Sequence, residues 1–291
     1  MERNETKDPI LYKITKQPWL KWIVLIIPLA YVVAVMVVPL LNILKRSVMD
    51  ESGFTLEYLI LVLTKPLYLK VLWITIRTGL IVTVVTILLA YPMAYLSVNA
   101  KRKGMRRLIT GGVLIPYWVS MLVRIFAWQI ILSKNGVLNG LLMALHIIDE
   151  PLTILYTSTA VVISLTHVLL PYMFLSMQAV MEGIDPNLKL AAEGMGAKAV
   201  TNFLTIFLPL SVPGIISGSS MVFVLALGFY IAPALLGGSG DMMMSNLIQE
   251  NMNNMNWNLS AALSVVLMFV VLVFFGVAYH FVGDKLFNRK A

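Results

Sequence analysis

Six long apolar segments dominate the sequence, and polar or charged residues bound each of them. The segments span residues 19–44, 71–98, 108–132, 156–181, 207–232 and 259–282. Each reaches the roughly 20 residues that an α-helix needs to cross the hydrocarbon core of a bilayer. They are too long and too continuously apolar for the alternating strands of a membrane barrel. The pattern therefore predicts an all-α membrane protein with six transmembrane helices.

The positive charges gather on one side of these segments. Fifteen of the 22 Lys and Arg residues lie in the N-terminal segment through Lys21, in the 99–107 and 182–206 loops and in the C-terminal tail, whereas five lie in the opposite loops. The positive-inside rule therefore places both termini in the cytoplasm. We expect a cytoplasmic N-terminal segment (1–18), a six-helix transmembrane domain (19–283) with a cytoplasmic loop at 182–206, and a cytoplasmic tail (284–291).

The composition supports an integral membrane protein. Of the 291 residues, 59% are hydrophobic and only 12% are charged, and the mean hydropathy is +0.86. Soluble domains carry about 25% charged residues. The net charge of +8 could suggest a nucleic-acid partner, but it lies beside the predicted spans, where membrane topology explains it. We expect a multi-pass membrane protein that binds lipids and no nucleic acid.

Signals for catalysis are absent from the sequence. It has no cysteine and therefore no thiolate nucleophile or thiolate metal site. It lacks the Gly-x-x-x-x-Gly-Lys-[Ser/Thr] loop that cradles ATP phosphates, and its three histidines show no metal-binding spacing. We expect no catalytic residue, no cofactor and no metal. His167, inside the fourth segment, is expected to form a hydrogen bond between helices.

The 182–206 loop has clear helix signals. Asp185 can cap a helix N-terminus, and Pro186 suits the first helical position. Gly196 can supply a turn where the helix would otherwise continue. The apolar positions recur at helical spacing and are expected to form one narrow face: Leu188, Ala191, Ala192 and Met195. From these residues alone, the helix could simply lie on the membrane face of its own chain.

The spacing within this loop resembles a known motif. Ala191-Ala192, three residues, Gly196, nine residues and then Ile206-x-Leu208-Pro209 is similar to the cytoplasmic EAA loop of ABC-importer permeases. In that family the loop forms a coupling helix that docks in a cleft of the ATPase subunit. Leu190 departs from the family, which usually has Glu there. The resemblance implies that the following residues couple the chain to an ATPase: Leu188, Leu190, Ala191, Ala192, Glu193 and Gly196.

Four further segments, at residues 120–125, 132–139, 226–238 and 256–264, resemble permeases of the spermidine/putrescine type. Together with the loop, the resemblance covers residues 68–282. It implies a type I ABC importer permease fold in the bacterial inner membrane. It also implies a second related permease subunit, an ABC ATPase dimer that hydrolyses the ATP, and a periplasmic or extracellular substrate-binding protein. The ligand stays open, because this branch also includes importers of opines, amino acids and other small solutes.

A polyamine would need acceptors along its path, yet no carboxylate lies in the middle of a predicted span. Aromatic faces attract ammonium groups, although the same rings could also serve in packing or in an interfacial belt. Arg77 and Arg124 enter the spans, where they could snorkel, pair with another group, or face a water-filled path. The candidate path residues are Tyr117, Trp118, Arg124, Tyr172, Phe229 and Tyr230.

Two other classes of protein compete with an importer. A secondary transporter usually has ionisable groups at midplane and internal repeats, and neither is evident here. A non-transport membrane assembly protein would account for the hydrophobicity but not for the spaced loop. We therefore favour the non-catalytic permease subunit of an importer.

Overall fold

The computed structural model describes residues 18–50 and 53–287, so most of the two expected terminal segments lies outside the described residues. The described chain is helical, with one two-stranded antiparallel hairpin that pairs Met49 with Phe54. In chain order the elements are α2 (Pro18–Val48), β1 (Met49–Asp50), β2 (Gly53–Phe54), α3 (Glu57–Thr64), α4 (Pro66–Asn99), α5 (Lys103–Leu114), η1 (Ile115–Trp118), α6 (Met121–Leu132), α7 (Val137–Ala144), α8 (Ser158–Glu182), α9 (Pro186–Gly194), α10 (Ala199–Asn202), η2 (Phe203–Phe207), α11 (Leu208–Gly228), α12 (Ile231–Leu236), α13 (Met244–Asn253) and α14 (Trp257–Phe287).

Six stretches of the described chain are long and apolar enough to cross a membrane, which confirms the predicted number. They are Trp22–Val48, Pro66–Asn99, Met121–Ala144, Ser158–Glu182, Ala199–Gly228 and Trp257–Val277. The first, second, fourth and sixth agree with the predicted segments to within a few residues. The third and fifth differ, and both differences have a physical cause.

The third predicted segment, 108–132, is not one helix. α5 ends at Leu114, the 3₁₀ turn η1 follows, and Val119 and Ser120 are extended before α6 begins. Pro116 cannot donate a backbone hydrogen bond, so a continuous helix would lose a bond at this position. The pattern of apolar residues does not show this break, because the residues around it are themselves apolar.

The fifth predicted segment, 207–232, also divides. α11 ends at Gly228, Phe229 is extended, and α12 begins at Ile231. At its start, the five residues of η2 form a π-helical turn. Single π turns within membrane helices are rare and occur often at functional sites. The aromatic pair that follows Gly228 therefore sits at a break between helices.

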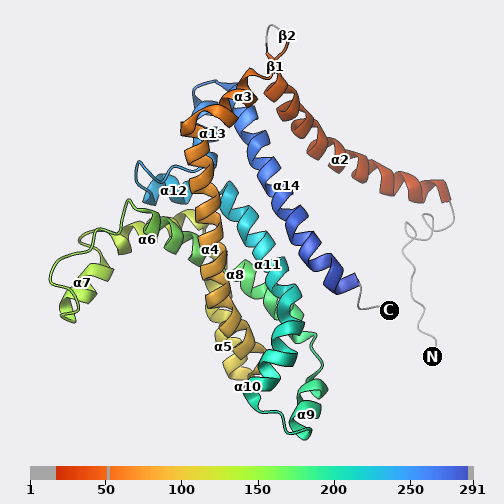
Figure 1. Cartoon of the computed structure of the whole chain (residues 1–291), viewed down its shortest axis with the longest axis vertical. Coiled ribbons are helices and arrows are strands. Elements are labelled where there is room, and N and C mark those ends of the chain that lie inside the picture. Colours follow the sequence, from red (N-terminus) through yellow and green to blue (C-terminus); the bar gives the residue numbers. More distant parts are fainter. Residues whose placement is uncertain (1–17, 51–52, 288–291) are drawn as a thin grey trace, which may run out of the picture.

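The centre of the molecule is formed by α4, α8 and α11, which pack side by side (Figure 1). α8 contributes fully buried side chains that include Leu165, Met173 and Phe174. Glycines let α11 approach α8 closely, because a Cβ added at Gly218 would lie 2.6 Å from the Sδ atom of Met173. Small residues at helix contacts drive association in membranes, where lipid is as apolar as the side chains.

The remaining helices surround this centre. α14 and α2 pack on one side, and α2 diverges from the bundle in Figure 1. The apolar side chains of α2 are largely exposed, as suits a helix whose solvent is lipid. The hairpin, α3 and α13 lie at one end of the molecule, and α9, α10 and the start of α5 lie at the other (Figure 1).

Because the chain contains no cysteine, single introduced thiols can test the predicted orientation. We expect Ser239→Cys and Glu150→Cys to react with an impermeant thiol reagent in intact cells, whereas Gly104→Cys and Lys198→Cys react only after the membrane is opened. All four positions are exposed in the structure, so a lack of reaction reports on the membrane and not on burial. Labelling of Lys198→Cys in intact cells would show that the orientation is the opposite of the predicted one.

Candidate functional site

The helix predicted in the 182–206 loop is present as α9. The Asp185 carboxylate accepts a hydrogen bond from the Asn187 N–H at 2.9 Å, and Pro186 is the first helical residue. Gly196 has a φ of +84°, a conformation that disfavours any residue with a Cβ. The predicted cap and turn are confirmed, and they limit α9 to a short, well-defined segment.

The buried and exposed side chains in and beside α9 differ from the prediction. Ala192 is buried against its own chain at 3% exposure, whereas Leu188 and Leu190 are 44% and 62% exposed and Met195 is 83% exposed. The predicted single face of Leu188, Ala191, Ala192 and Met195 is therefore wrong in one respect: Ala192 faces inward. Helical spacing alone could not show this, because an isolated helix does not reveal which side its own chain covers.

α9 is also held from the chain that follows it. The side-chain amide of Asn202, which is 4% exposed, donates to the Lys189 carbonyl at 3.3 Å. Asn202 ends α10 and leads directly into the π turn η2 and then α11. The rings of Phe203 and Phe207 in this turn pack edge-on against Tyr95 of α4, with centroids 5.4 and 4.9 Å apart. These contacts connect α9 to the start of α11.

Five of the six candidate path residues meet in one pocket of about 520 Å³. Tyr117 and Trp118 come from η1, Arg124 from α6, Tyr172 from α8, and Phe229 from the break after α11. The Tyr117 and Tyr172 rings pack edge-on at 5.5 Å. Val168, Leu169 and Leu225 also line the pocket; no local motif marks them, and only their helical neighbours could have suggested them. Both helix breaks therefore open onto the same space.

Arg124 is the only charged side chain that lines this pocket in the described chain. It is 9% exposed, and its buried Nε and Nη1 atoms have no hydrogen-bond partner among the described residues. Of the alternatives, pairing of these atoms within the described chain is not observed for Arg124, whereas Arg77 on α4 is exposed. A buried donor without an acceptor is costly, so the guanidinium calls for an acceptor from outside the chain.

The expected hydrogen bond of His167 is present. Trp128 of α6 donates its indole N–H to Nδ1 of His167 on α8 at 3.1 Å, and the two rings are 5.7 Å apart. With Nδ1 as an acceptor, neutral His167 carries its proton on Nε2. The pair joins α6 to α8 immediately beside Arg124 and so fixes one wall of the pocket.

Comparisons with known proteins agree with this architecture. The family model described as "Binding-protein-dependent transport system inner membrane component" matches residues 86–286. The chain belongs to this family. The spermidine/putrescine transport system permease protein PotB of Haemophilus influenzae is 34% identical over 229 residues, covering 78% of this chain and 79% of that protein. The inner membrane ABC transporter permease protein YdcU of Escherichia coli is 28% identical over 213 residues, covering 69% of this chain and 67% of that protein.

Among solved structures, a bacterial alginate ABC transporter in complex with its alginate-bound periplasmic protein aligns with a TM-score of 0.73. The alignment covers 97% of this chain and 99% of that one at 18% identity. This likeness establishes the fold, which is that of a type I ABC importer permease. The chain is thus a multi-pass permease of the inner membrane, and the alternatives of a secondary transporter and of an assembly protein are removed.

The sixth candidate residue of the permease, Tyr230, does not join the aromatic pocket. It lines a separate pocket of about 630 Å³ between α12 and α13, together with polar residues such as Asn246 and Glu250. Its carbonyl accepts a hydrogen bond from the Asn246 side chain at 2.8 Å. The neighbouring residues Phe229 and Tyr230 therefore point into two different spaces, which their adjacency in sequence could not show.

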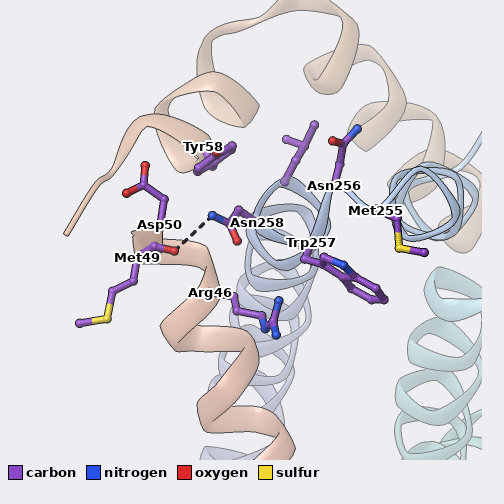
Figure 2. Close-up of a pocket in the computed structure, with 9 residues that line it drawn as sticks. Arg46, Met49, Asp50, Tyr58, Met255, Asn256, Trp257 and Asn258 are labelled. Atoms are coloured by element: carbon purple, nitrogen blue, oxygen red, sulfur yellow. Dashed lines mark hydrogen bonds between the residues drawn. The ribbon is translucent and has the colours of Figure 1, made fainter. Parts of the chain in front are cut away.

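The Asn256-Trp257-Asn258 segment has a structural role at the end opposite α9. It lines a pocket with the end of α2, and Figure 2 shows Asn258 bonded to the Met49 carbonyl, at 3.3 Å. The Arg46 guanidinium lies 5.8 Å from the centre of the Trp257 ring. These contacts attach the first span to the last.

The separation of Phe229 from Tyr230 predicts unequal effects of their substitution. Phe229→Leu keeps apolar bulk but removes a ring face from the aromatic pocket, so binding-protein-dependent uptake should fall about two- to five-fold. Tyr230→Leu, the matched control, should change uptake less than about two-fold. Initial uptake rates in cells with equal amounts of permease measure both. Equal losses would mean that the pocket containing Phe229 has no special part in the path.

Proposed function

We propose that the chain is the permease subunit of an ATP-driven importer that moves spermidine or putrescine inward from a periplasmic or extracellular binding protein. The observation that carries this proposal is the 34% identity, over 78% of the chain, to spermidine/putrescine permeases of enteric and related bacteria. The permease itself is non-catalytic in this proposal. An ABC ATPase dimer hydrolyses ATP, and a second related permease subunit completes the path.

The exposed apolar side chains of α9 support its proposed role in coupling. Leu188 and Leu190 of α9, and Met195 directly after it, expose apolar side chains at one end of the molecule (Figure 1). An ATPase cleft would bury them, with Ala191 and Glu193 beside them. Ala192 and Gly196 would instead shape α9 from within, through close packing and a left-handed turn.

The aromatic pocket supports the passage of a cation without holding it too tightly. Rings of Tyr117, Trp118, Tyr172 and Phe229 face a common space that holds no carboxylate of the described chain. Each ring attracts an ammonium group by about 0.5–2 kcal/mol, according to how dry the site is. Several weak contacts of this kind allow binding and release in turn, whereas a fixed buried anion would retain a polycation.

Arg124 favours a second candidate substrate. The ammonium groups of a polyamine have no acceptor for a guanidinium, whereas a solute that carries a carboxylate has one that matches its geometry. The orphaned, buried donors of Arg124 would be satisfied by an amino acid or an opine. If the solute is a polyamine, the acceptor must come from the second permease subunit.

The coupling role of α9 can be tested at an exposed position. Leu188→Asp should leave the isolated permease folded, because the residue is 44% exposed. Docking would bury the new carboxylate without a partner, which costs more than the roughly 1.4 kcal/mol that a ten-fold loss represents. Co-purification of the ATPase and uptake should therefore both fall by more than about ten-fold. Asn187→Asp, the adjacent exposed control, should retain both; normal uptake by Leu188→Asp would leave α9 as a surface helix.

The two candidate substrates can be separated with a matched pair, since putrescine is ornithine without its carboxyl group. If the proposal is right, putrescine competes for uptake and ornithine does not, and Arg124→Gln leaves that preference unchanged. If the second candidate is right, ornithine is preferred. Arg124→Gln then lowers ornithine uptake by about ten-fold or more, the value of one charge-assisted hydrogen bond. Competition assays with radiolabelled solutes measure both.

A further inference from the structure

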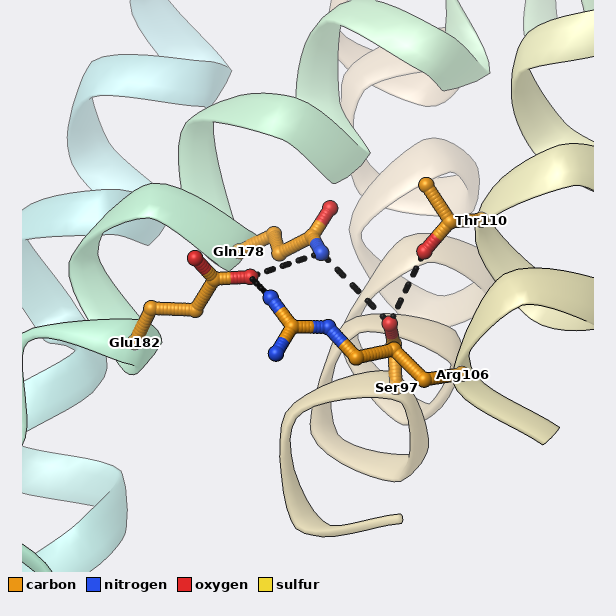
Figure 3. A network of polar contacts seen from close by, with 5 residues as sticks. All are labelled: Ser97, Arg106, Thr110, Gln178 and Glu182. Carbon is orange, nitrogen blue, oxygen red and sulfur yellow. Dashed lines mark hydrogen bonds and ion pairs between the residues drawn. The ribbon is translucent and has the colours of Figure 1, made fainter. Parts of the chain in front are cut away.

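A chain of polar side chains joins three helices at the end of the molecule that carries α9. Figure 3 shows Ser97 of α4, Arg106 and Thr110 of α5, and Gln178 and Glu182 of α8. The Arg106 guanidinium donates to Oε1 of Glu182 at 2.5 Å, and the Gln178 amide donates to the same oxygen at 2.8 Å. One carboxylate thus receives donors from two different helices.

This series of hydrogen-bonded side chains begins at the surface and ends in the interior of the molecule. The Arg106 and Glu182 side chains are 49% and 40% exposed. At the other end, the Ser97 hydroxyl is fully buried, 3.0 Å from the Thr110 hydroxyl and 3.5 Å from the Gln178 amide. An exposed ion pair adds little to folding stability, because water screens it. The charged end can therefore open and close while the buried end keeps the helices in register.

The Arg106–Glu182 pair joins two segments, one that leads to α9 and one that leads to the aromatic pocket. Glu182 is the last residue of α8 and comes three residues before Asp185, which caps α9. Arg106 lies in α5, which leads through η1 to Tyr117 and Trp118 of the aromatic pocket. The pair therefore links the base of α9 to the helix that ends at the pocket.

We propose that Arg106 and Glu182 are positioning residues of the coupling segment, forming a releasable tether through which a displacement of α9 moves α5 and the Tyr117–Trp118 wall of the pocket. This inference rests on the proposed docking of an ATPase on α9. The tether holds the end of α8, which precedes α9, and the Asn202 contact holds the residues that follow α9. The tether leads through α5 to η1, and Asn202 leads to α11. Both η1 and α11 end at the pocket.

The test is the number of solute molecules transported per ATP hydrolysed by the complete importer in liposomes. The solute is putrescine, or ornithine if the competition assay selects it. Arg106→Gln and Glu182→Gln should each lower this ratio about two- to five-fold, the range expected for loss of one partly exposed ion pair. Arg107→Gln removes the same charge from the next residue, which forms no ion pair with a described residue, and should leave the ratio unchanged.

Reversal of the pair provides the decisive comparison. Arg106→Glu combined with Glu182→Arg restores the ion pair, and Gln178 can present its amide oxygen to the new guanidinium, so the ratio should return to the wild-type value. A merely structural role would alter the yield of folded complex and not the ratio. An unchanged ratio in both single variants, or a reversed pair that stays uncoupled in an intact complex, overturns the tether.

Failure of the tether can be told apart from failure of the docking proposal. The Arg106 and Glu182 variants should retain the co-purified ATPase, because they lie outside the exposed face of α9. Leu188→Asp tests docking separately. If that variant retains the ATPase and full uptake, docking on α9 is wrong, and the tether falls with it; if only the tether variants behave as wild type, docking stands alone.

Discussion

The need to hydrogen-bond every backbone group within a bilayer shapes this permease more than any other constraint. Helices may break at membrane depth only where protein or water in a cavity replaces the lost bonds. Here the break after α11 meets that condition: the Phe229 and Tyr230 carbonyls accept hydrogen bonds from the Ser245 and Asn246 side chains, each at 2.8 Å. The break in the third predicted segment retains a bond from the Val119 N–H to the Pro116 carbonyl at 3.1 Å. Both breaks face the aromatic pocket, so the interruptions are part of its construction.

Arg124 differs from the other polar groups beside the pocket, because its buried donors have no acceptor in the described chain. The Phe229, Tyr230 and Pro116 carbonyls at the breaks accept hydrogen bonds from within the chain, and the neighbouring Trp128 indole N–H donates to Nδ1 of His167. The Arg124 guanidinium alone in this region keeps buried donors without an acceptor in the described chain, apart from the single Thr166 hydroxyl. Leaving a buried charged donor unpaired costs several kcal/mol. The backbone carbonyls at the helix breaks are hydrogen-bonded within the chain, whereas the one charged group of the pocket requires an acceptor from another molecule.

The sequence revealed the local features well and the long-range ones poorly. The number of apolar spans, the Asp185 cap and the Gly196 turn depend on nearby residues, and the structure has all three features. Pro116 and Gly228 are residue types at which a helix can be interrupted, but their uniformly apolar surroundings do not show that the helices end there. The inward position of Ala192, the separation of Phe229 from Tyr230 and the pairing of Arg106 with Glu182, 76 residues apart, depend on how distant helices pack. A pattern within one segment carries no information about such contacts.

The packing also explains how a short loop helix could influence a distant pocket. α9 itself buries little apolar surface, since only Ala192 is enclosed, so its position is set by what holds its two ends. Beyond those ends the helices are closely packed: α8 packs on α4 and α11 through buried side chains, and Gly214 and Gly218 bring α11 into close contact with α8. Closely packed helices move as bodies and do not deform continuously. If α9 is displaced as we propose, movement of α5 and the π turn would relieve the force more readily than distortion of the central helices, because these two elements contain fewer buried residues.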